Sequence, residues 1–103
     1  MFANHPDHYR LTDHAGLRMQ QRHIPQHLLE MVLEYGRTIH ARGATYKVVG
    51  RKEVEHFQRK GVDLRDAEGI HVLLGEDDVV LTTYRNHDLR HIRPSKRRHS
   101  VYH

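Results

Sequence analysis

The spacing of apolar residues predicts a helix close to the start of the chain. Thr12 suits an N-cap position and Asp13 suits the first turn, so a helix is expected over residues 13–22. Ala15 and Met19 lie four residues apart and would form its buried stripe.

A second helix is expected from Pro25 to residue 35. Proline is favoured at the first helical position, and Gly36 suits the position just past the helix end. Between them runs a wide apolar face, typical of a helix packed on a core, which is made of Leu28, Leu29, Met31, Val32, Leu33 and Tyr35.

Beyond the second helix, the helical period gives way to short runs of β-prone residues. Residues 37–42 and 45–49 are expected to pair as a hairpin around a turn at Gly43 and Ala44. Lys47 would then lie on the second strand of this hairpin.

A third helix and a second hairpin follow. Residues 52–60 are rich in helix formers and stop at a glycine, which predicts a short helix anchored by Val54 and Phe57. Residues 70–74 and 79–84 flank a short segment of glycine, glutamate and aspartate, and this pattern is typical of two antiparallel strands around a tight turn.

This order of elements predicts an α+β domain. Two N-terminal helices and a third short helix would pack on one face of a four-stranded antiparallel sheet, and the other face would stay free for a ligand. A chain of 103 residues is the usual size of one domain. We expect an N-terminal arm at residues 1–8, the domain at residues 9–93 and a basic C-terminal tail at residues 94–103.

Composition excludes several classes of function. The chain has no cysteine, so it offers neither a disulfide framework nor a thiolate zinc site. No glycine-rich phosphate-binding loop is present, and no cofactor is predicted. No apolar run approaches the ~20 residues of a membrane span or the length of a signal peptide, so we expect a cytoplasmic protein with no membrane partner.

Positive charge is concentrated at the C-terminal end. Residues 85–103 carry a balance of +5, whereas residues 1–84 carry a balance of −1. A basic tail of this kind neutralises phosphates and predicts a polyanionic partner, for which RNA is the best candidate. The alternative is a terminus that only improves solubility. The residues expected to contact nucleic acid here are Arg85, Arg90, Arg93, Lys96, Arg97 and Arg98.

One stripe of the first helix combines an imidazole with two guanidiniums. His14, Arg18 and Arg22 recur every four residues and therefore lie on one side of the helix, beside the buried stripe. Guanidiniums bind phosphate oxygens, and an imidazole can move a proton. The stripe is thus a candidate catalytic and phosphate-binding site, and the alternative is an ordinary solvated helix face.

Hydroxyl side chains on the last strand form a second candidate. Thr82 and Tyr84 lie two residues apart and so face the same side of the sheet, as would His71 and Leu73 on the neighbouring strand. Hydroxyls there could hold a phosphate, and Lys47 could add a charge. The alternative is that threonine and tyrosine are simply favourable strand residues.

Twelve histidines raise a metal-binding hypothesis. Neither a glutamate in an HExxH pattern nor a cysteine pair accompanies them, so we predict no metal site. The pairs whose spacing could bring two imidazoles together are His5 with His8, His23 with His27, and His87 with His91.

Residues 12–24 and 82–84 together resemble a bacterial family of small domains of unknown function. The shared pattern is THAxxRMxxRxI, here TDHAGLRMQQRHI, with a closing strand that ends in TxY, here TTY. Asp13 is an extra residue within this pattern. His23 stands where a glycine is usual, so the turn between the first two helices is expected to differ. The likeness spans roughly residues 9 to 85.

That family is similar to the barnase, EndoU, colicin and RelE group of metal-independent ribonucleases, many of them toxins. The resemblance implies RNA cleavage by attack of a 2′-hydroxyl on the adjacent phosphate. It also implies an acidic antitoxin or immunity protein as a partner. The family has no settled catalytic set, so the roles are our own hypotheses: His14 as base or acid, and Arg18 and Arg22 as phosphate clamps. Tyr84 and Thr82 would orient the phosphate.

Two other functions stay open at this point. The first is a non-catalytic accessory or regulatory protein that binds nucleic acid, in which the same arginines only hold phosphate. The second is a histidine-rich domain that binds metal or another protein.

Overall fold

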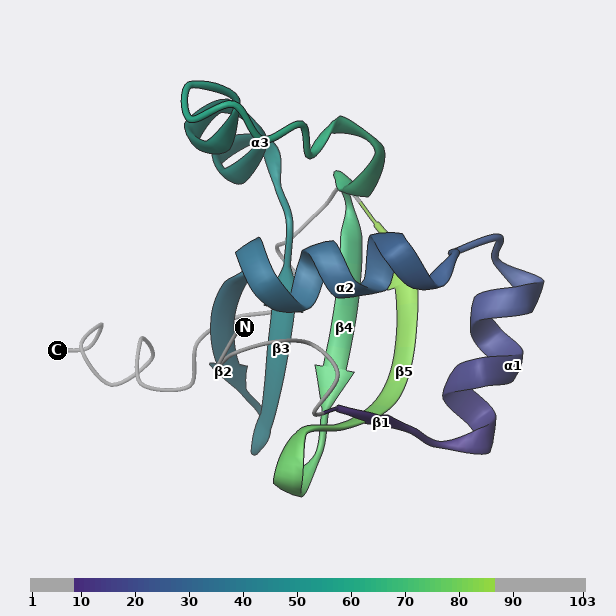
Figure 1. The fold of residues 1–103 in the computed structure, drawn as a ribbon. Coiled ribbons are helices and arrows are strands. Elements are labelled where there is room, and N and C mark those ends of the chain that lie inside the picture. Colours follow the sequence, from purple (N-terminus) through teal and green to yellow (C-terminus); the bar gives the residue numbers. More distant parts are fainter. Residues whose placement is uncertain (1–8, 87–103) are drawn as a thin grey trace, which may run out of the picture.

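The computed structural model describes residues 9–86, which form an α+β domain with a five-stranded sheet (Figure 1). The predicted arm at residues 1–8 and the predicted tail at residues 94–103 lie outside the described residues. None of the helices between Tyr9 and Asn86 has the length and apolar character needed to cross a membrane.

Helices α1 (Asp13–Gln21) and α2 (Gln26–Tyr35) form within one residue of their predicted bounds. The hydroxyl of Thr12 accepts the backbone N–H of Ala15 at 3.0 Å, which caps α1 as expected. Pro25 lies just before α2, as its N-cap residue, instead of in its first turn.

The turn between α1 and α2 depends on a left-handed residue. His23 adopts a φ of 55° there. The backbone N–H of Ile24 donates to the Met19 carbonyl at 2.9 Å and that of His23 donates to the Gln20 carbonyl at 3.3 Å, the two bonds of a Schellman motif. Glycine reaches this φ without steric cost, whereas histidine adopts it at some conformational cost.

The predicted four-stranded antiparallel sheet is wrong, because the sheet has five strands in the order β1-β5-β4-β3-β2. Strands β2 (Arg37–Ala41), β3 (Ala44–Val48), β4 (Ile70–Leu74) and β5 (Val79–Arg85) are antiparallel neighbours. Strand β1 (Arg10–Leu11) adds a parallel neighbour to β5 and makes the sheet mixed. A strand of two residues is too short to show an alternating pattern. Its partner strand β5 also lies almost 70 residues later in the sequence, so no local pattern links the two.

The first hairpin turns one residue earlier than predicted. A two-residue turn of this kind needs positive φ at both central residues. Arg42 and Gly43 supply these angles, at 55° and 73°. Ala44 would be strained in that conformation, and it begins β3 instead, paired with Ala41. The turn before β5 lies where it was predicted, at Glu76–Asp78.

The main hydrophobic core lies between α2 and one face of the sheet (Figure 1). Leu29 and Val32 of α2 are buried there together with Ile70 and Val72 of β4. Burying an aliphatic side chain fully stabilises the fold by about 1.5–3 kcal/mol, so this layer supplies much of the driving force for folding.

The opposite face of the sheet is only partly open. A second, smaller cluster of Ile39, Ala41 and Val48 is buried there, with half-buried Tyr46 packed against it. Towards β5 the side chains become half-exposed. The expectation that this whole face stays free for a ligand is therefore too broad, because only part of it is accessible.

The three helices do not all cover the same face. Helix α2 lies across the sheet, α1 runs beside β5, and α3 (Arg51–Gln58) lies beyond one end of the strands (Figure 1). The ring of Phe57 meets the ring of Tyr35 at 4.9 Å between centroids, which joins α3 to α2. Val54 is buried, so both predicted anchors of this helix are in contact with the core. The 3-10 turn η2 (Arg65–Ala67) then leads into β4.

Candidate nucleic-acid interface

The stripe of His14, Arg18 and Arg22 lies on the side of α1 that is turned away from α2. Gly16 and Gln20, on the other side of the buried stripe, border a groove of about 540 Å³ next to the start of α2. Gly16 and Gln20 therefore face α2. The basic stripe flanks the buried stripe from the opposite side, so it is directed towards the sheet face that α2 leaves uncovered.

Two hydrogen bonds tie the ends of α1 to β5. The hydroxyl of Thr12 donates to the carbonyl of Leu81 at 3.3 Å. At the other end, Nη1 of Arg22 donates to the carbonyl of Thr83 at 2.9 Å. β1 pairs with β5 only at Val79 and Val80, so these bonds satisfy carbonyls of β5 beyond that pairing. The basic stripe is thus held alongside β5.

His14 and Arg18 contact each other on the exposed part of the stripe. Nε of Arg18 donates to Nε2 of His14 at 3.3 Å, and Nη1 of Arg18 donates to the side-chain carbonyl oxygen of Gln21 at 2.9 Å. Nε2 is therefore the ring nitrogen of His14 that lies against the Arg18 guanidinium. Arg18 is thereby fixed beside a ring that can take a proton.

Tyr84 lies on β5 with its ring against a buried histidine. The ring centroids of Tyr84 and His71 are 5.0 Å apart, and the rings are tilted by 59°. Burial raises the pKa of the Tyr84 hydroxyl above its ordinary value, and Tyr46 raises it further, whereas the charges of Arg22 and Arg42 lower it. The hydroxyl therefore keeps its proton at neutral pH and can donate a hydrogen bond to a phosphate oxygen.

The register of the sheet confirms that Thr82 and Tyr84 share a face with Leu73 and His71. Tyr84 pairs with His71, and Thr82 pairs with Leu73. Leu73 in turn pairs with Tyr46 on β3, so a second tyrosine lies on the same face. Thr82, Tyr84, Leu73 and Tyr46 are all half-exposed.

Tyr46 and Arg42 are not among the site residues predicted from the sequence. The turn pattern located the hairpin that carries them. However, β3 and β4 are separated by α3, and no tight turn sets their register. A slip of one residue would bring Lys47 instead of Tyr46 onto the Tyr84 face, so only the register of the folded sheet distinguishes the two.

Lys47 and Arg85 lie apart from the rest of the candidate site. Lys47 pairs with Val72, whose side chain is in the main core, so it lies on the α2 side of the sheet. Nη1 of Arg85 donates to the carbonyl of Asp66 at 3.2 Å, also on that side. The other residues predicted to bind nucleic acid lie outside the described residues, and they are Arg90, Arg93, Lys96, Arg97 and Arg98.

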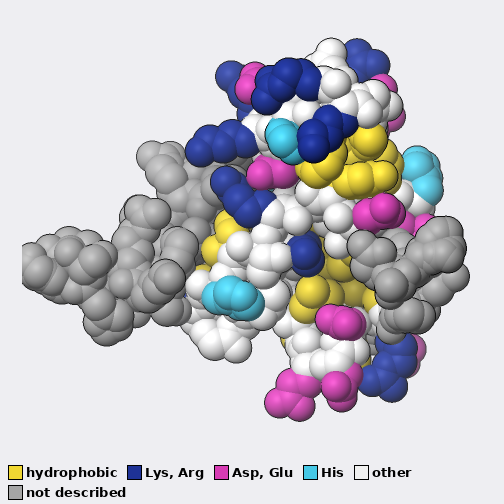
Figure 2. Space-filling view, turned by 60° about the vertical axis from the view of Figure 1, so that its left-hand side comes forward, with side chains coloured by type: hydrophobic (Ala, Val, Ile, Leu, Met, Phe, Trp, Pro, Cys, Tyr) yellow, Lys and Arg dark blue, Asp and Glu magenta, His cyan; other side chains and the backbone are white. Residues whose placement is uncertain are grey.

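A second basic surface covers α3. Lysine and arginine side chains gather at the top of Figure 2, over this helix. Its exposed members include Arg51, Lys52, Arg59 and Lys60. No role was predicted for it from the sequence, although four of the ten residues from 51 to 60 are lysine or arginine. It lies at a different end of the molecule from α1. Substitutions on this surface can therefore serve as controls for substitutions in the α1 stripe.

The histidine pairs do not form a metal centre within residues 9–86. In this range, no three side chains of histidine, cysteine, aspartate or glutamate gather in a way that could hold a metal ion. His23 and His27 are both exposed. The pairs His5 with His8 and His87 with His91 lie outside the described residues.

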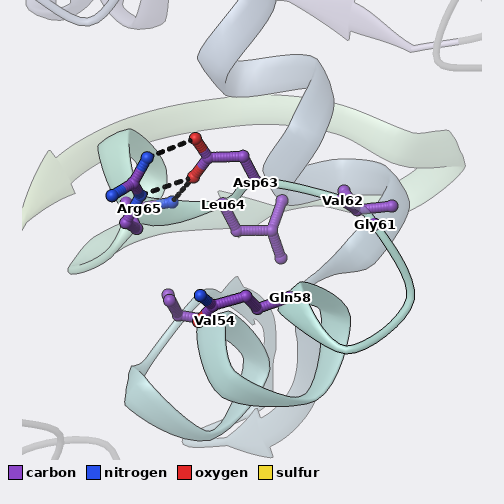
Figure 3. A pocket seen from close by; sticks show the side chains of 7 residues that line it. All are labelled: Val54, Gln58, Gly61, Val62, Asp63, Leu64 and Arg65. Carbon is purple, nitrogen blue, oxygen red and sulfur yellow. Dashed lines mark hydrogen bonds and ion pairs between the residues drawn. The ribbon is translucent and has the colours of Figure 1, made fainter.

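A cavity of about 270 Å³ opens between α3 and the loop that follows it (Figure 3). None of the predicted site residues lines it. At its rim, Arg65 donates from Nη2 and Nε to the Asp63 carboxylate at 2.9 and 3.0 Å. The side-chain hydrogen bond from Arg65 is the main reason that the pKa of Asp63 falls from 3.8 to about 2.

Replacing Arg65 with glutamine is expected to raise the pKa of Asp63 back towards 3.8, because the side-chain bonds and the charge that favour the carboxylate are lost. The measurement is an NMR titration of the carboxyl carbon. The folded-state pKa lies below the unfolded value, so the pair stabilises the fold above pH 3.8 and loses this effect as the pH falls towards about 2. Arg59→Gln is the control, and an unchanged Asp63 midpoint in Arg65→Gln contradicts the assignment.

The fold and the site together define a small α+β domain in which a basic helix stripe lies beside a tyrosine-bearing part of the sheet. Comparison with known protein families, with curated proteins and with solved structures finds no match to this chain. The likeness to the ribonuclease group therefore stays a prediction from the sequence.

Proposed function

We propose that this chain is a cytoplasmic RNA-binding protein that cleaves RNA without a metal ion. The observation that supports this most directly is that Arg22 bonds to β5 beside Tyr84, so that the stripe with His14 and Arg18 is held along the strand that carries the two candidate hydroxyls. Metal-independent RNA cleavage needs a base, an acid and cations, and an imidazole, a hydroxyl and guanidiniums can supply these functions.

In the proposed reaction, Nε2 of His14 takes the proton of the 2′-hydroxyl. The 2′-oxygen then forms a bond to phosphorus, and the bond from phosphorus to the 5′-oxygen breaks. The proton held on His14 then passes to the 5′-oxygen, directly or through a water molecule, so the products are a 2′,3′-cyclic phosphate and a 5′-hydroxyl and the imidazole is regenerated. Arg18 and Arg22 stabilise the charge that develops on the phosphate, and the hydroxyls of Tyr84 and Thr82 orient it.

Binding without cleavage is the second candidate, and one contact favours it. Nε of Arg18 donates to the same nitrogen of His14 that would accept the proton. For catalysis, Arg18 has to turn from His14 to the phosphate when RNA binds. If Arg18 stays on His14, the ring nitrogen cannot take the 2′-hydroxyl proton, and the stripe binds phosphate without cleaving RNA. An acidic antitoxin or immunity protein would neutralise the same positive charge in either case.

The test of the proposed function is incubation of the purified protein with end-labelled single-stranded RNA in excess EDTA. Cleavage that survives EDTA and leaves cyclic-phosphate ends supports the proposal. Loss of cleavage in His14→Ala and Arg18→Ala ties the activity to the stripe and excludes a contaminating nuclease. Salt-sensitive binding with no cleavage by the wild type contradicts the enzymatic part and favours the second candidate.

Arg18→Gln is expected to weaken RNA binding and to lower the salt dependence of the affinity, because one phosphate contact is lost. For a single strand, the slope of log K against log salt should decrease by about 0.7. Lys52→Gln, which removes one charge from α3, serves as the control and should leave the slope unchanged. An equal decrease of the slope in both variants would show that RNA affinity depends on the overall charge of the protein and not on the α1 stripe.

A further inference from the structure

We propose that the half-exposed part of the sheet around Tyr46 and Leu73 binds a base of single-stranded RNA by stacking. This inference rests on the proposed function and names its substrate class as unpaired RNA. It adds a base-binding site to the phosphate-binding stripe of α1, and it assigns a role to a tyrosine that the cleavage reaction does not use.

The site follows from the register of the three central strands. Tyr46 on β3 and Tyr84 on β5 lie on the same face, with β4 between them. Two strand spacings of ~4.8 Å and one two-residue step of ~6.8 Å separate their Cα atoms by about 12 Å. Tyr46 and Tyr84 thus occupy separate positions on this face, one suited to a base and the other to the phosphate of the proposed reaction.

Tyr46 is anchored by a buried cluster and yet remains partly exposed. It packs against the buried cluster of Ile39, Ala41 and Val48, yet it is itself only half-buried. Leu73, its partner on β4, is also half-exposed and extends the apolar surface. Because the ring is already held in place by its cluster, little side-chain freedom is lost when a base stacks on it.

Positive charges on two sides of this face suit the phosphates of a bound strand. Arg22 reaches in from α1 at the β5 edge, and Arg42 lies in the hairpin turn before β3. Arg22 is held at the carbonyl of Thr83, next to Tyr84, and Arg42 is exposed at the end of the hairpin that carries Tyr46. Exposed aromatic rings flanked by guanidiniums are the usual means of binding single strands, whereas the bases of a duplex are stacked on each other and unavailable.

The test compares binding of a short single-stranded 2′-O-methyl RNA, which cannot be cut, with binding of the matching duplex. Tyr46→Leu removes the aromatic ring and keeps an apolar side chain on its cluster. We expect it to bind the single strand between about 5-fold and about 150-fold more weakly, the range for loss of one stacked base, and to bind the duplex as the wild type does. Tyr46→Phe keeps the ring and should bind both probes like the wild type.

Unchanged binding of the single strand by Tyr46→Leu overturns the stacking site. An equal loss of affinity for both probes also overturns it, because such a loss reflects charge or folding, and thermal unfolding of each variant distinguishes these two causes. The probe cannot be cleaved, so the result is independent of catalysis. A wild type that binds the probe but never cuts RNA contradicts only the proposed reaction, and a wild type that binds neither probe contradicts RNA binding itself.

Discussion

Replacing His14 with alanine is expected to lower the rate of RNA cleavage by about 10²- to 10⁴-fold, the contribution of a positioned general acid or base. His14 is the imidazole of the α1 stripe, and its Nε2 already accepts a hydrogen bond from Arg18. Without this ring, the 2′-hydroxyl proton has no nearby acceptor on the stripe. The measurement is the single-turnover rate constant at saturating protein, which separates chemistry from RNA binding.

His27→Ala is the matched control, because His27 is an exposed histidine on α2 and does not belong to the stripe. It should cleave RNA at the rate of the wild type. Imidazole added to the buffer should restore part of the activity of His14→Ala, since the small molecule can occupy the space left by the ring. A His14→Ala variant that cleaves as fast as the wild type rules out a role for this residue in proton transfer.

Replacing Gly36 with alanine is expected to lower the free energy of unfolding by about 2–3 kcal/mol, the cost of forcing an extra methyl group into a packed site. A Cβ at this position would overlap the carbonyl oxygen of Val32 and would lie 3.0 Å from that of Val48. Both atoms belong to the backbone and cannot move aside easily. For a domain of this size, the melting temperature should fall by about 10–20 °C, which calorimetry measures.

Gly16→Ala adds the same methyl group where it meets nothing within 4 Å. Gly16 lies inside α1, where alanine is favoured over glycine by about 0.5–1 kcal/mol, so this variant should be more stable than the wild type. The two substitutions thus differ in sign because Gly16 occupies a helical position with open space around it, whereas a methyl group at Gly36 would meet two carbonyls. A Gly36→Ala variant as stable as the wild type would mean that α2 and β3 do not approach each other as closely as the structure shows.

Gly36 also shows how a correct prediction can rest on an incomplete reason. The sequence analysis placed it just past the end of α2, where glycine is common because it tolerates positive φ. The observed φ is −71°, in an ordinary extended conformation. Glycine is needed because a Cβ would meet the Val32 carbonyl in α2 and the Val48 carbonyl in β3. The contact with β3 joins two distant segments and leaves no trace in a local pattern.

The candidate site could be predicted in part. The four-residue spacing placed His14 and Arg18 on one side of α1, and the alternation along β5 placed Thr82 and Tyr84 on one face. Both inferences needed only the geometry of a single element. The position of the α1 stripe beside β5 could not be predicted from the geometry of a single element, because the bond from Arg22 to Thr83 joins residues 61 positions apart in the sequence.

Local patterns were sufficient for the helices and for the antiparallel strands, because periodicity, capping residues and turn residues act over a few positions. Strand β1 is revealed only by the folded structure, because its partner β5 lies near the other end of the described sequence; the parallel pairing of the two makes the sheet mixed. Folding also sets the register of β3 against β4, which brings Tyr46 and not Lys47 to the face of Tyr84. In both cases the pairing is specified by side chains that meet only in the folded core, and not by neighbours along the chain.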